Sequence, residues 1–283
     1  MKKSLLFGFS FLSILYSCEK IDHDVFFKIG SDLEYKFSDI ELYDTSTHIL
    51  YFKTVHDEFK DIENGTFTFL NNGDPIYTGS FWPGYSSSIP SGPFIMSPPY
   101  MYGNYALRIE NWNFDNHDLR NDTRIIDILN QNNLLHSGLA ISSSLIEITG
   151  TQLTFRFTVT NQDQSNLMII DIEKTGPNLF HFFTNGLYIY DTAHNEVFSS
   201  NIEHQTPDPW NSWNIEWLSD LKAGESKEFT INYELNDPLI PGEYDTLFEF
   251  PGLSYQVTKD QLYQENSRIW LGDITINKRI VIQ

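Results

Sequence analysis

Residues 115–122 contain the densest group of side chains that could take part in acid–base or metal chemistry. Asp115, Asp118 and Asp122 could supply two carboxylates that share the acid and base roles of a hydrolase, if their surroundings separate their pKa values. The same oxygens could bind Ca²⁺, but the stretch lacks the glycine and the terminal glutamate of an EF-hand loop, and Arg120 lies among the carboxylates. We therefore interpret the stretch as a solvated loop in which Asp122 caps a short helix, and we expect no metal ion or other cofactor.

Three aromatic residues beside prolines in predicted loops are the candidate ligand contacts. Trp82 and Tyr85 lie at the start of a proline-rich stretch, residues 83–99, and Trp210 directly follows a proline. A large aromatic side chain is harder to bury in a loop than in a strand, and its face can stack on a sugar ring. By contrast, Trp213, Ile215 and Trp217 alternate with polar residues, which predicts the inner face of a strand (residues 213–218).

The chain carries no sequence motif of a known catalytic centre. It has no nucleophile elbow, no Walker loop, no dinucleotide fingerprint and no His-Glu-x-x-His zinc motif. Its eight histidines are scattered, without the spacing that places two metal ligands on one side of an element. These observations favour a non-enzymatic protein, and a hydrolase that uses the carboxylates of residues 115–122 remains the alternative.

The N-terminus has the pattern of a secretion signal that ends at the single cysteine of the chain. Lys2 and Lys3 precede an apolar run from Leu5 to Tyr16, which is shorter than the roughly 20 residues that a membrane-spanning helix needs. We therefore expect residues 1–17 to be removed. Acidic residues then predominate, and residues 18–34 are predicted to form a solvated tether.

The residues at this junction, Leu15-Tyr16-Ser17-Cys18, resemble the lipobox of bacterial lipoproteins, and the acidic residues after them resemble the export signal of Bacteroidota lipoproteins. Tyr16 departs from the small or β-branched residue usual at its position. The resemblance implies that Cys18 is thioether-linked to a diacylglyceryl group and that its freed amine can be acylated, for example with palmitate. Two or three acyl chains would hold the protein permanently to a membrane of the cell envelope, with the outer membrane expected and exposure at the cell surface left open.

The composition indicates a folded, acidic protein. Hydrophobic residues make up 40% of the chain and aromatic residues 15%, which is ample for a core, and the formal net charge is −20. This charge repels phosphate backbones and anionic lipid headgroups. We therefore expect no nucleic-acid partner and no membrane contact beyond the acyl chains.

The predicted fold is mainly β. Short strands in two domains must position the candidate carboxylate and aromatic side chains. Residues 35–136 are expected to form a small β domain that contains the proline-rich loop. Its hairpins are predicted at residues 35–54 and at 66–81, where Asn71-Asn72-Gly73-Asp74 forms the turn. Its one short helix should place Ile125, Ile128 and Leu129 on a common face.

Residues 137–283 are expected to form an antiparallel β-sandwich. In residues 153–160, apolar and polar side chains alternate, as they do again from Phe229 to Leu235. The turns at residues 221–226 and 241–244 resemble the paired turns of bacterial immunoglobulin-like modules. That resemblance implies an immunoglobulin-like fold and leaves the function open.

Two short motifs, Asp191-Thr192-Ala193 and Asp245-Thr246-Leu247, resemble the acceptor of Bacteroidota O-glycosylation. The resemblance implies modification of Thr192 and Thr246, and exposed threonines at strand ends are the alternative interpretation.

The sequence as a whole predicts a lipid-anchored envelope protein without enzymatic activity that binds a glycan or a protein partner. Trp82, Tyr85 and Trp210 are the expected ligand contacts, and Cys18 is the expected lipid attachment. A hydrolase and a structural subunit of an envelope complex are the alternatives.

Overall fold

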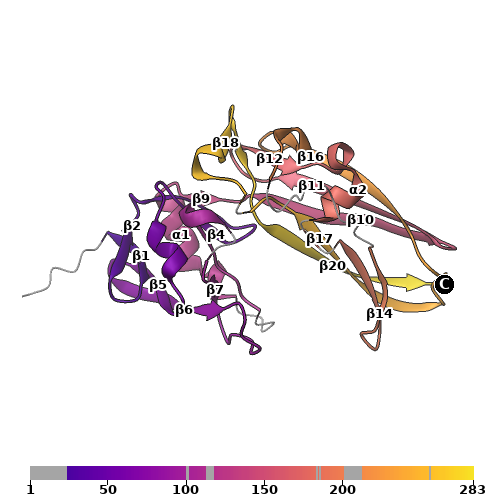
Figure 1. Ribbon diagram of the computed structural model, residues 1–283, viewed down its shortest axis with the longest axis horizontal. Coiled ribbons are helices and arrows are strands. Elements are labelled where there is room, and N and C mark those ends of the chain that lie inside the picture. The colour runs from indigo at the N-terminus through magenta and orange to yellow at the C-terminus, as the bar shows by residue number, and fades with distance from the viewer. Residues whose placement is uncertain are drawn as a thin grey trace, which may run out of the picture.

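The computed structural model describes residues 24–99, 102–112, 118–182, 184, 186–200, 212–254 and 256–283. Cys18, Asp115 and Trp210 therefore lie outside the described residues. Strands dominate the described chain and form several sheets, which confirms the mainly β prediction. Figure 1 shows the first half of the chain beside the second along the long axis of the molecule. No helix in the described part of the chain is long and apolar enough to span a membrane.

Two sheets and a helix build the first half. The first sheet has the order β2 (Leu33–Lys36), β1 (Val25–Ile29), β5 (Gly65–Asn71), β6 (Asp74–Pro83), β7 (Phe94–Ser97). The second has the order β8 (Ala106–Arg108), β4 (Ile49–Phe52), β3 (Ile40–Asp44), β9 (Leu135–His136). Strand β7 runs parallel to β6 at the edge of its sheet, so the proline-rich stretch contributes no central strand, as predicted.

The local signals in this half are confirmed. Asn72 and Gly73 have φ values of 51° and 87°, as the tight turn between β5 and β6 requires. Helix α1 (Thr123–Gln131) begins after Asp122, whose side chain accepts a hydrogen bond from the backbone N–H of Arg124. The predicted face of this helix, Ile125, Ile128 and Leu129, is buried.

The tether prediction is wrong for residues 25–34. Four of the five residues of β1 are buried, and Phe26 stacks on Phe37 with 4.6 Å between ring centroids. Burial of the apolar run Val25-Phe26-Phe27 outweighs the acidic character of the surrounding segment.

Three sheets build the second half. The first has the order β10 (Leu139–Thr149), β11 (Gln152–Asn161), β16 (Ser226–Glu234). The second has the order β14 (Glu196–Ser199), β13 (Leu187–Asp191), β17 (Gly242–Pro251), β20 (Asp273–Ile282). The third has the order β15 (Leu218–Leu221), β12 (Asn166–Ile170), β19 (Ser267–Ile269), β18 (Tyr263–Gln264). The alternation predicted along β11 is confirmed, because Leu153, Phe155, Phe157 and Val159 are all buried. Phe155 packs against Phe248 of β17, with 4.6 Å between ring centroids, so side chains of two sheets share one core.

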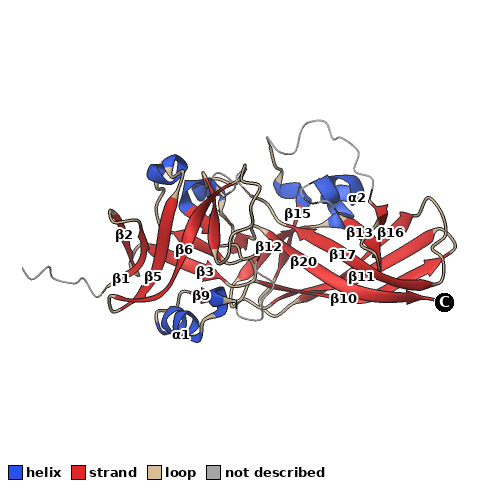
Figure 2. Cartoon of the chain, turned by 90° about the horizontal axis from the view of Figure 1, so that it is seen from below, coloured by secondary structure: helices blue, strands red, loops and turns tan. Residues whose placement is uncertain are grey.

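The second half also departs from the expected pattern. Strands β12 and β19 pair in parallel, because the chain crosses to other sheets before it returns. Helix α2 (Ile172–Phe182) was not predicted, and Gly176 interrupts it with a φ of 70°. Residues 213–218 do not form the predicted strand, because Ile215–Trp217 is a 3-10 helix and β15 begins at Leu218. Figure 2 shows the helices outside the sheets. The immunoglobulin-like arrangement stays a prediction.

Candidate functional site

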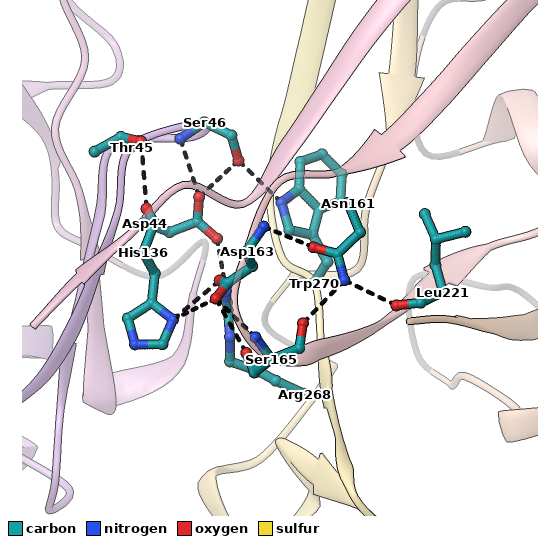
Figure 3. Close-up of polar contacts among 10 residues, drawn as sticks. All are labelled: Asp44, Thr45, Ser46, His136, Asn161, Asp163, Ser165, Leu221, Arg268 and Trp270. Atoms are coloured by element: carbon teal, nitrogen blue, oxygen red, sulfur yellow. Dashed lines mark hydrogen bonds and ion pairs between the residues drawn. The ribbon is translucent and has the colours of Figure 1, made fainter. Parts of the chain in front are cut away.

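A buried charge network fixes the first half of the molecule to the second. Arg268 of β19 is 2% exposed, and its Nη2 donates hydrogen bonds to Asp44 Oδ2 at 2.8 Å and to Asp163 Oδ2 at 3.2 Å. Asp44 ends β3 in the first half, whereas Asp163 follows β11 in the second (Figure 3). His136 of β9 lies 2.8 Å from the other oxygen of Asp163. Two contacts therefore cross between the halves, one from Arg268 to Asp44 and one between His136 and Asp163.

Electrostatics favour the charged forms of Arg268 and Asp163. Burial acts to lower the pKa of Arg268, but the neighbouring Asp44, Tyr51 and Asp163 together outweigh burial and raise it. Burial likewise acts to raise the pKa of Asp163, but its hydrogen bond with His136 and the charge of Arg268 lower that pKa to about 2. The guanidinium also lies over the ring of Tyr51, 5.3 Å from its centroid.

The junction around the network is closely packed. Trp270 is fully buried, and its indole N–H donates to Ser46 Oγ at 3.2 Å. Gly138, where the chain passes from β9 to β10, has a φ of 62°, and a Cβ there would lie 2.1 Å from Ser46 Oγ. One hydrophobic cluster includes Tyr51 and Tyr105 together with Leu253 and Trp270, so the core is continuous across the junction.

A cleft of about 580 Å³ lies beside this junction, within the size range of small-ligand sites. We call it the interdomain cleft. The first half contributes Met96, Tyr102, Arg108, Glu110, Asn111, Trp112 and Arg120, and the second half contributes Glu249, Asp273 and Thr275.

Trp112 is the exposed aromatic residue of this cleft. It is 44% exposed, and its indole N–H donates to Glu110 Oε2 at 2.9 Å. The ring also contacts Phe94 edge-to-face, with 4.9 Å between centroids. The indole is therefore held in place while much of its surface stays open to a ligand.

The arginines of the cleft are already paired. Arg108 donates two hydrogen bonds to Asp273, with 2.9 Å between Nη2 and Oδ1, and a further one to the Tyr102 hydroxyl at 2.8 Å. Arg120 pairs with Asp118 at 2.8 Å. Three lining carboxylates accompany these two cations, so the cleft favours a neutral ligand over an anionic one.

The sequence-predicted site residues are not brought together. Trp82 lies near the end of β6, and its indole N–H donates to the Ser88 carbonyl of the proline-rich loop at 3.3 Å. Tyr85 is 90% exposed on that loop. Neither lines the interdomain cleft. Trp210 lies outside the described residues. Trp112 was missed, although its position in a polar segment was a usable signal.

The carboxylates proposed for a hydrolase have structural partners. Asp118 caps a 3-10 helix and pairs with Arg120, while Asp122 caps α1 and pairs with Arg124 at 2.7 Å. Burial acts to raise the pKa of Asp118, but the hydrogen bonds and charge of Arg120 lower it to about 2. Asp118 is therefore ionised near neutral pH and poorly suited to donate a proton. The described residues contain no group of three or more His, Cys, Asp or Glu placed to bind a metal ion.

The two predicted glycosylation sites differ in accessibility. Thr192 is exposed in the turn between β13 and β14. Thr246 is 3% exposed, and its hydroxyl donates to the Lys278 carbonyl at 2.8 Å. The folded protein therefore presents Thr192, and not Thr246, to a modifying enzyme.

The chain matches no family model and no curated protein. Among solved structures it is similar to a β-glucosidase of Kluyveromyces marxianus in complex with glucose, at 12% identity and a TM-score of 0.22 over 51% of this chain and 14% of that enzyme. It is also similar to a mutant β-glucosidase of Listeria innocua in complex with laminaribiose, at 13% identity and a TM-score of 0.21 over 48% of this chain and 16% of that enzyme. Likeness at this level supports no conclusion about fold or function.

Proposed function

We propose that this protein is a lipid-anchored component of a bacterial cell envelope that binds a neutral glycan in the interdomain cleft. The lipobox-like residues around Cys18 support the anchor. The observation that carries the binding function is Trp112, a hydrogen-bonded and half-exposed indole in a polar cleft between two halves that share one hydrophobic cluster. An aromatic face beside hydrogen-bonding groups suits the apolar face and hydroxyl groups of a sugar.

Replacing Trp112 with alanine is expected to weaken glycan binding roughly tenfold or more, because central aromatic anchors contribute most to such interfaces. Affinity should be measured by isothermal titration with four soluble neutral polysaccharides: a β-glucan, an α-glucan, a xylan and a mannan. The matched control is Tyr85→Ala, which removes an exposed aromatic ring outside the cleft and should leave affinity unchanged. Full affinity in Trp112→Ala would contradict the assignment.

The anchor is tested separately by intact mass. Protein extracted from membranes of the native host should begin at Cys18 and carry added acyl mass, and the Cys18→Ala variant should lose both properties. Protease treatment of whole cells then reports whether the protein faces outward. An unmodified and soluble wild-type protein would refute the anchor.

A protein partner is the second candidate ligand, favoured by the proline-rich loop. Tyr85 and Ile89 are 90% and 70% exposed on this loop, which internal hydrogen bonds of Trp82 and Ser86 to Ser88 hold in shape. Exposed tyrosine and isoleucine side chains on an ordered loop are suited to protein contacts. Loss of co-purifying envelope proteins in Tyr85→Ala, with glycan affinity intact, would support this candidate.

A further inference from the structure

The sheet of β14, β13, β17 and β20 carries a shallow hollow of about 550 Å³ on its outward face. Side chains alternate between the two faces of a strand, and Phe248 and Ile276 of this sheet lie in the hydrophobic core. Their neighbours Leu247 and Asn277 therefore point to the opposite face, and Leu247 belongs to neither hydrophobic cluster of the described residues. We call the depression that Tyr190, Leu247 and Asn277 line there the sheet-face hollow.

Two tyrosines of β13 present their rings on this outward face. Tyr188 and Tyr190 are two positions apart, and their ring planes lie within 12° of each other, with 5.9 Å between centroids. This arrangement is offset stacking, in which neither ring fully covers the face of the other. Among the described residues, neither hydroxyl group has a hydrogen-bond partner. The pair therefore offers ring surface and two free hydroxyl groups to a ligand.

The register of the sheet joins the sheet-face hollow to the interdomain cleft. Outward side chains that lie opposite one another on β13, β17 and β20 form rows, and successive rows are about 6.8 Å apart. The three rows, counted from the junction, are Glu249 with Thr275; Tyr188 with Leu247 and Asn277; and Tyr190 with Asp245 and Arg279. The first row lines the interdomain cleft, and the third row lines the hollow. Since β17 and β20 extend between the junction and the C-terminus (Figure 1), one sheet face leads from the cleft past both tyrosines.

The charges on this face are balanced. Arg279 donates hydrogen bonds to both carboxylate oxygens of Asp245, at 2.8 Å from Nε and at 3.2 Å from Nη2. Lys278 contributes to the lining from a position between Asn277 and Arg279, so its side chain points to the other face of the sheet. The exposed amide of Asn277 can both donate and accept hydrogen bonds. The face therefore favours a neutral ligand that carries hydroxyl groups and apolar ring surface.

We infer that the glycan is a linear chain that runs from the interdomain cleft onto the sheet-face hollow, with successive sugar rings beside Trp112, Tyr188 and Tyr190. This inference rests on the proposed binding of a neutral glycan in the cleft and names the class of that glycan. The first and third rows are about 14 Å apart, so the whole path is longer than a disaccharide. Long oligosaccharides should therefore bind more tightly than short ones, which reach only the cleft.

The test is calorimetry on the full chain with a disaccharide and an octasaccharide of each of the four polysaccharides named above. The wild-type protein should bind one octasaccharide about tenfold more tightly than its disaccharide, because the additional rings contact the tyrosines. Tyr188→Ala/Tyr190→Ala should lose most of this advantage and keep the disaccharide affinity, which also shows that the cleft is folded. Trp112→Ala should weaken the binding of both lengths. Tyr85→Ala, the matched control, should change neither.

The outcomes separate the hollow from the cleft. Undiminished octasaccharide affinity in the double tyrosine variant overturns this inference alone, since Trp112→Ala still tests the cleft. A loss in the double tyrosine variant without a loss in Trp112→Ala refutes glycan binding in the cleft and overturns the continuous path. Absence of binding for every oligosaccharide refutes both proposals. If the double variant lowers the melting temperature, Asn277→Arg decides, because this position is exposed and the long side chain should obstruct the hollow and remove the same advantage.

Discussion

Replacing Arg268 with alanine is expected to lower the free energy of unfolding by roughly 3–5 kcal/mol, because it leaves buried carboxylates without their cation. Asp44 and Asp163 both have fully buried side chains, and Arg268 Nη2 donates to each of them. The loss should appear in urea unfolding of the full chain. We expect a single transition, because one hydrophobic cluster crosses the junction between the two halves.

The matched control for this variant is Arg279→Ala. Arg279 also lies on a strand and also pairs with an aspartate, Asp245, at 2.8 Å, but its side chain is 66% exposed. Exposed ion pairs are screened by water and salt and add little to stability, so this variant should be close to the wild-type protein. Equal stability of the Arg268 and Arg279 variants would show that the buried network does not hold the halves together.

The second large effect is a loss of stability in acid that depends on Asp163. The pKa of Asp163 is about 2 in the folded protein, against an ordinary value of 3.8. The unfolded chain therefore binds a proton more readily, so the stabilisation is complete above about pH 5 and is lost as the pH falls through 4 towards 2. This difference in pKa corresponds to roughly 2 kcal/mol at most.

Comparison with Asp163→Asn isolates this contribution from that of other carboxylates. At pH 7 the wild-type protein should be the more stable of the two, and the difference should shrink as the pH is lowered from about 5 to about 2. Unfolding free energies from denaturant titrations at several pH values provide the measurement. A difference that stays constant over this range would mean that Asp163 does not titrate as the geometry requires.

Local signals in the sequence predicted the parts of the fold that local physics determines. The turn at Asn72-Gly73 needs positive φ, the alternation along β11 places one face in the core, and Asp122 satisfies a free N–H at the start of α1. Each of these features depends on residues within a few positions of one another. Helix α2 was missed because Gly176-Pro177 interrupts its helical pattern.

The candidate sites depend on tertiary packing and could not be predicted in the same way. Arg268 meets Asp44 across 224 positions of sequence, and the lining of the interdomain cleft extends from Met96 to Thr275. Paired charges and scattered polar residues do not recur at a regular spacing in the sequence. The sequence therefore gives no sign that these residues come into contact in the fold. The aromatic residues that the sequence did suggest, Trp82 and Tyr85, belong to a loop outside the cleft.

The most direct test of the central claim follows the indole N–H signal of Trp112 by NMR during titration with the polysaccharide that binds best. The chain has six tryptophans, so single Trp→Phe variants can assign each indole signal. If the glycan binds in the interdomain cleft, the Trp112 signal should shift until binding saturates, while that of the buried Trp270 stays in place. Saturated binding with an unmoved Trp112 signal would contradict the proposal.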